Sequence, residues 1–212
     1  MPSQERSRRR YQAIIEATET LLQTNNIEDL SLYDIAKQAK IAPASVHYLF
    51  STVAAIHVEL NRLYNEQLTA KVLEANRNKL TTKNSSWQEL TRAHMETSRA
   101  VLNGHRAMSE IMLGPALHRS SRAKNRETNA FFAQSVLAVT RQRFVMPEIP
   151  DLERVYLFAA EISEGLWAGA YATNGTIDDE TFAESLRATV AYLRCFLPDT
   201  LMVRETESNE KL

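Results

Sequence analysis

The stretch Leu32–Phe50, LYDIAKQAKIAPASVHYLF, has the pattern of two short helices joined by a turn. Ser31 and Asp34 resemble an N-terminal capping box, which predicts a first helix running to about residue 39. Pro43 suits the first turn of the next helix, where a missing amide hydrogen costs nothing. The second helix is expected to end near Phe50, with the turn at residues 40–42.

Two helices that cross steeply need facing apolar side chains, a small residue where the backbones approach, and an apolar residue in the turn. The stretch supplies them as Ile35, Ala36, Ala39, Ile41, Val46 and Leu49. This is the pattern of a helix-turn-helix, in which the second helix enters the DNA major groove. On spacing alone, an ordinary corner of two helices remains the alternative.

Two further features favour DNA binding. The outer face of the second helix offers side chains that can touch bases or phosphates, namely Pro43, Ala44, Ser45, His47 and Tyr48. A basic cluster just before the first long helix could act as a flexible arm that reaches phosphates or a minor groove; it consists of Arg6, Arg8, Arg9 and Arg10. The second helix has no Arg or Lys, so we expect readout by Ala44 against thymine methyl groups, by hydrogen bonds from Ser45 and His47, and by DNA shape.

The rest of the chain predicts an all-α fold. Only 5 Gly and 6 Pro occur among 212 residues, and apolar residues recur at helical spacing. Helices are expected at about 7–24, 52–78, 87–102, 105–113, 122–145 and 152–172, and from 178 to about 198. We divide the chain into a DNA-binding domain at 1–51, a helical core at 52–203 and a frayed tail at 204–212.

Composition excludes several functional classes. The formal net charge of -1 indicates no particular partner. The lone Cys195 fits a reducing compartment, and no signal peptide or membrane span is recognisable, so a cytoplasmic protein is expected. The sequence has no Gly-rich phosphate loop, no HExxH and no paired Cys motif, so we expect neither an enzyme nor a metal or other cofactor.

The chain resembles the TetR family of transcriptional regulators. The match runs from RRRYQAIIEATETLLQ (8–23) through SLYDIAKQAKIAPASVHYLFSTVAAI (31–56), and a weaker one covers EISEGLWAGAYATNGTIDDETFAESLRATVAYL (161–193). The resemblance implies an all-α homodimer with a three-helix DNA-binding domain followed by a six-helix core. It implies a repressor that binds a palindromic DNA operator and is released by a small-molecule effector.

The resemblance also assigns residues. Ser31 caps the first helix of the motif against a phosphate; Pro43, Ala44, Ser45 and His47 lie against base edges; Tyr48 and Thr52 lie against phosphates. Three positions depart from the family pattern. Lys40 and Asn26 stand where Gly is usual, and Lys40 costs about 1 kcal/mol if its φ is positive. Val53 replaces a usual Lys, so one phosphate contact is expected to be lost.

A dimer surface and a ligand pocket are expected in the core. Gly165 and Gly169 form a smooth strip that lets another helix approach closely, and packing within the chain is the alternative. The resemblance favours a dimer interface that also includes Leu186, Val190, Leu193 and Leu197. Such a dimer places the second helix of each helix-turn-helix, the recognition helix, about 34 Å from its counterpart. Candidate ligand-lining residues are Trp87, His94, Met112, Phe132, Trp167 and Tyr171, with plain core packing the alternative for each. The rival function is a helix-turn-helix protein whose core binds a protein partner and no inducer.

Overall fold

The computed structural model describes residues 2–79, 86–115 and 119–204. Within these ranges the chain forms nine α-helices, one short 3-10 turn and no strand, with a single isolated β-bridge between Phe144 and Val203. The all-α fold expected from the sequence is confirmed. The expected tail lies outside the described residues except for Arg204, whose amide donates to the carbonyl of Arg143.

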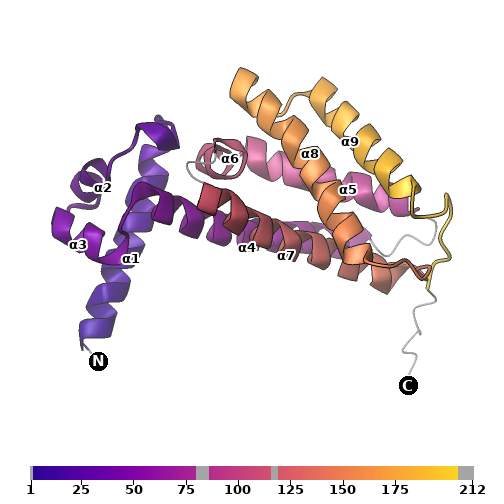
Figure 1. Cartoon of the computed structure of the whole chain (residues 1–212), viewed down its shortest axis with the longest axis horizontal. Coiled ribbons are helices and arrows are strands. Elements are labelled where there is room, and N and C mark those ends of the chain that lie inside the picture. The colour runs from indigo at the N-terminus through magenta and orange to yellow at the C-terminus, as the bar shows by residue number, and fades with distance from the viewer. Residues whose placement is uncertain (1, 80–85, 116–118, 205–212) are drawn as a thin grey trace.

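The first three helices form a small lobe at one end of the molecule (Figure 1). They are α1 (Pro2–Leu21), α2 (Leu32–Ala39) and α3 (Pro43–Leu49), with the 3-10 turn η1 at Ile27–Asp29 between α1 and α2. The lobe closes around Ile14, Ile35 and Val46, which are fully buried. Their burial confirms the apolar contact expected between the two short helices.

Six helices form the larger lobe: α4 (Val53–Lys79), α5 (Trp87–Asn103), α6 (Arg106–Leu113), α7 (Arg119–Arg143), α8 (Leu152–Asn174) and α9 (Asp179–Arg194). The long helix α4 leads from the small lobe into the large one and packs along α7, while α8 pairs with α7 and α9 (Figure 1). Thr52 opens α4, because its hydroxyl accepts a hydrogen bond from the Ala55 amide at 3.1 Å.

One apolar cluster continues from the small lobe into the large one. It joins Ile35 and Val46 to Ile56 of α4 and Met108 of α6. A second cluster fills the far end of the core between α5, α7, α8 and α9. Burial of shared apolar surface of this kind stabilises the relative placement of the two lobes.

Candidate nucleic-acid interface and core cavity

The start of α2 is fixed by a reciprocal cap. The Asp34 amide donates to the Ser31 hydroxyl at 3.2 Å, and the Ser31 amide donates to the Asp34 carboxylate at 3.0 Å. Hydrogen bonds from the Ser31 side chain and backbone lower the pKa of Asp34. The capping box predicted from the sequence is confirmed.

The turn between α2 and α3 depends on a left-handed residue. Lys40 has φ 56° and ψ 39°, and the Ile41 amide reaches back to the Ala36 carbonyl at 3.1 Å. This closes α2 in the way that glycine usually does, at a cost for a residue with a Cβ. Asn26, the other position where the family usually has glycine, has an extended backbone with φ -87° and ψ 157° and therefore has no need of glycine.

The outer face of α3 is open to solvent. Tyr48 is 84% exposed, Pro43, Ala44 and His47 are exposed, and Ser45 is partly exposed. Tyr33, on the first turn of α2, is also 67% exposed and was missed by the sequence reasoning. Large aromatic side chains that are exposed to solvent on a small lobe indicate a surface that binds a partner.

The basic cluster near the N-terminus is helical, which corrects the expectation of a flexible arm. Helix α1 begins at Pro2, so Arg8, Arg9 and Arg10 lie within it and are exposed on its surface. Arg9 pairs with Glu5 at 2.5 Å. Proline is favoured in the first turn of a helix, and the helical run simply extends further toward the N-terminus than the apolar pattern indicated.

A cavity of about 120 Å³ lies in the large lobe among α4 to α9. Its walls are largely apolar, and the residues that line it include Leu68, Met95, Leu102, Met112, Phe132, Val136, Tyr156, Trp167 and Leu193. The polar residues among them are Asn61, Asn65, Thr91, His94, Ser98, Asn129, Ser163, Glu164 and Thr189. An apolar chamber with a few polar groups is the usual form of a small-molecule site.

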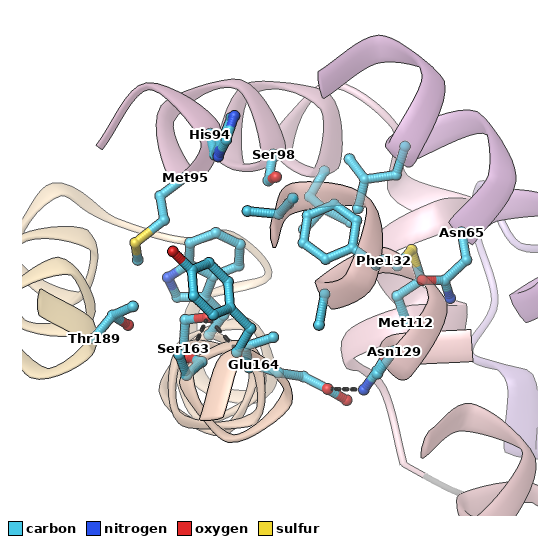
Figure 2. A pocket seen from close by; sticks show the side chains of 18 of the residues that line it. Asn65, His94, Met95, Ser98, Met112, Asn129, Phe132, Ser163, Glu164 and Thr189 are labelled. Atoms are coloured by element: carbon cyan, nitrogen blue, oxygen red, sulfur yellow. Dashed lines mark hydrogen bonds between the residues drawn. The ribbon is translucent and has the colours of Figure 1, made fainter. Parts of the chain in front are cut away.

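One carboxyl group belongs to this cavity. The Asn129 amide donates to the Glu164 carboxyl, and the two side chains meet at the edge of the chamber (Figure 2). Burial raises the pKa of Glu164 to about 7, and the neighbouring charge of Glu161 adds to this effect. Glu164 was missed from the sequence, where a charged residue on a helix indicates a solvated face.

Among the residues that the structure describes, two polar atoms in the cavity wall have no hydrogen-bond partner. They are Nε2 of His94 and Oγ1 of Thr189, on side chains that are each 4% exposed. Burial lowers the pKa of His94 to about 4, so its imidazole is neutral at pH 7. Buried polar groups are normally paired, and these two are therefore free to bind a ligand.

Four of the six predicted ligand-lining residues line the cavity: His94, Met112, Phe132 and Trp167. The other two lie elsewhere. Trp87 packs in the second apolar cluster and donates its indole hydrogen to the Pro198 carbonyl at 2.9 Å. The Tyr171 hydroxyl donates to Glu110 at 2.9 Å. No group of three metal-ligating side chains occurs within the described ranges.

Solved structures with the same arrangement of helices identify the fold. A TetR-family regulator from Streptomyces coelicolor has a TM-score of 0.66 at 20% identity, covering 89% of this chain and 99% of its own. A TetR regulator from Rhodococcus sp. RHA1 has a TM-score of 0.62 at 17% identity, covering 88% and 96%. The Thermus thermophilus repressor FadR, solved in complex with lauroyl-CoA, has a TM-score of 0.63 at 16% identity, covering 94% and 99%.

The chain has the TetR fold. No protein-family model matches the sequence, and no curated protein sequence matches it. The order of the helices in the TetR fold, with three in the small lobe and six in the core, is the order expected from the resemblance.

On α8 of this TetR fold, small residues leave an open strip. A Cβ built on Gly165 or Gly169 meets nothing within 4 Å, and Leu166 between them is 40% exposed. The apolar stripe expected on the last helix faces the interior of the subunit, and because α9 ends at Arg194, Leu197 lies just beyond the helix. Leu186, Leu193 and Leu197 are buried in the subunit's own core, and Val190 is partly buried against it.

Helix α6 connects the core to the small lobe. The Arg106 guanidinium donates to the Leu22 carbonyl and, at 3.1 Å, to the Asn25 carbonyl. The buried Glu110 carboxyl accepts from the Ile27 amide at 3.0 Å and from Tyr171 of α8. The same helix contributes Met112 and Leu113 to the cavity wall, so one short element touches both candidate sites.

Among the described residues, no helix is both long and apolar enough to cross a lipid bilayer.

Proposed function

We propose that this protein is a DNA-binding transcriptional regulator, a repressor that binds a palindromic operator as a homodimer and is released by a small-molecule effector. The observation that carries the proposal is the solvent-exposed outer face of α3 within a capped helix-turn-helix on a TetR fold. This function requires no catalytic group, and it places the protein with the DNA in the cytoplasm.

We carry the assignment of contacts over from the resemblance to the TetR family. Pro43, Ala44, Ser45 and His47 read base edges, and Tyr48 and Thr52 contact phosphates. Ser31 adds a phosphate contact at the start of α2. Arg8, Arg9 and Arg10 contact phosphates from the surface of α1, in place of the flexible arm expected from the sequence.

A homodimer is supported by the open strip on α8. Glycine inside a helix costs about 1 kcal/mol relative to alanine, and the subunit itself does not need the space that Gly165 and Gly169 leave. Close approach of a second α8 supplies a reason for both glycines. We centre the dimer surface on Gly165, Leu166 and Gly169, with Val190 at its margin.

An effector is supported by the cavity. The volume of the cavity and its unpaired polar atoms distinguish this core from a fully packed one. A fully packed core would instead favour the rival function, in which the core binds a protein partner. One structure with the same fold holds lauroyl-CoA, and a ligand in the core of this chain is proposed by analogy. Ligand binding would shift α6 and tilt α4, moving the two α3 helices away from groove spacing.

The test is selection of bound fragments from random duplex DNA by the purified full chain. The proposal requires an enriched palindrome whose half-sites are about one helical turn apart. His47→Ala should relax the sequence preference and Tyr48→Phe should weaken all sequences alike, while the control Gln134→Ala, on the exposed face of α7, should change neither. An unenriched library, or both α3 variants binding like the unsubstituted chain, refutes the proposal.

A further inference from the structure

The size of the core cavity limits what it can hold. It measures about 120 Å³, and an apolar cavity of about 150 Å³ is known to accept benzene. The cavity therefore suits a molecule with one ring or an equally short chain. Phe132, Tyr156 and Trp167 supply aromatic surface for such a body.

The charged groups that line the cavity favour one sign of charge on the ligand. Among the described residues that line the cavity there is no Lys or Arg, and His94 is neutral at pH 7 because it is buried. A carboxylate or phosphate brought into this chamber would meet no cation there, which makes its burial costly. The ionisable acid in the wall is Glu164.

The Glu164 carboxyl has room for a cationic partner. Within the described part of the chain it forms no ion pair, and Asn129 is its hydrogen-bond partner. Arg122 is near enough to lower the pKa of Glu164 but makes no ion pair with it. Glu161, one turn before Glu164 on α8, forms an ion pair with Arg126 of α7 at 3.0 Å. A protonated amine would supply the missing charge and several hydrogen bonds at once, and aromatic faces attract the same group.

We propose that the effector is a small, mainly apolar molecule that carries a single protonated amine, with the amine at Glu164 and the apolar body against Phe132 and Trp167. This inference rests on the proposed function, since it names the chemistry of that effector. Nε2 of His94 and Oγ1 of Thr189, which lie across the chamber from Glu164 (Figure 2), then bind any second polar group of the ligand.

The test compares three probes of similar shape by calorimetry on the full chain at pH 8, with no DNA present. Benzylamine should bind at least about tenfold more tightly than benzyl alcohol, and benzoate should bind most weakly. Benzoate binding as tightly as benzylamine, or no binding of any probe, overturns the inference. Because DNA is absent, either result leaves the proposed operator binding unaffected.

Two matched variants test whether Glu164 causes the preference for the amine. Glu164→Gln should abolish the preference for the amine and change the affinity for benzyl alcohol by less than about threefold, which also reports that the cavity is intact. Glu161→Gln, which removes a neighbouring carboxylate already paired with Arg126, should keep the preference. Amine preference retained in Glu164→Gln overturns the inference, and the three-probe comparison on the unsubstituted chain stands even if a variant fails to fold.

Discussion

Replacing Glu164 by Gln should stabilise the folded protein at high pH. The substitution keeps the shape of the side chain and an oxygen that can accept the hydrogen bond from Asn129. It removes a carboxyl whose pKa is about 7, against 4.5 in the absence of the fold, mainly because of burial. The charges that face this carboxyl are Glu161, which raises its pKa, and Arg122, which lowers it.

The sign and size of the change in stability follow from proton linkage. Between pH 4.5 and 7 the folded chain holds a proton that the unfolded chain releases, so stability falls as pH rises through this range. A pKa difference of this size corresponds to at most about 3 kcal/mol, and partial exposure of the residue reduces it to about 1–2 kcal/mol at pH 8. For a chain of this length that is a rise in Tm of about 3–6 °C, and at pH 5 the gain should be small.

Differential scanning calorimetry of both proteins at pH 5 and pH 8 measures this difference directly. The control is Glu161→Gln, which removes one neighbouring charge that raises the pKa of Glu164 but also breaks the ion pair with Arg126. Any gain in Tm that grows with pH should therefore be smaller than for Glu164→Gln. Equal Tm differences at the two pH values, or a lower Tm for Glu164→Gln at pH 8, would refute the reasoning that burial of a carboxyl sets this pKa.

Three further predictions concern the helix-turn-helix and the proposed dimer. Ser31→Ala removes the cap of α2 and should lower the free energy of unfolding by about 1 kcal/mol in urea titration, and an unchanged midpoint would contradict the role of the cap. Lys40→Gly relieves a left-handed backbone and should raise the stability by about 0.5–1 kcal/mol in the same assay, whereas a loss of stability would show that the strain is absent. Leu166→Glu places a charge on the open strip of α8 and should convert a dimer to a monomer in sedimentation equilibrium with the helix content retained, and a surviving dimer would move the interface elsewhere.

The helix-turn-helix could be predicted because the sequence signals that specify it are local. The capping pair Ser31 and Asp34, the first-turn Pro43 and the buried positions Ile35 and Val46 are all separated by a few residues, and each acts through contacts within or between adjacent short helices. The left-handed turn at Lys40 was expected only through the family pattern, because nothing about lysine itself favours a positive φ.

The cavity could be predicted only in part, because its walls come from six helices. His94 and Met112 were found as bulky residues on apolar faces, but Trp87 has the same character and lies in the second cluster instead. Glu164 is buried by packing against α7, which depends on contacts between α7 and α8 that no local pattern specifies. The stripe of leucines on α9 was correctly recognised as apolar, but sequence alone does not distinguish a face that packs on its own subunit from one that packs on a partner.

The hydrogen bonds made by α6 allow an estimate of the free energy available to the proposed release mechanism. A hundredfold loss of operator affinity needs about 2.7 kcal/mol of coupling, and a hydrogen bond to a charged group contributes about 1.5–3 kcal/mol. The Arg106 and Glu110 side chains make several such bonds to the segment that follows α1 and to η1. Because Met112 lines the cavity less than one turn beyond Glu110, a ligand that displaces the end of α6 strains these bonds directly. In the proposed mechanism, loss of one or two of these bonds in the ligand-bound state would supply a coupling free energy of this size.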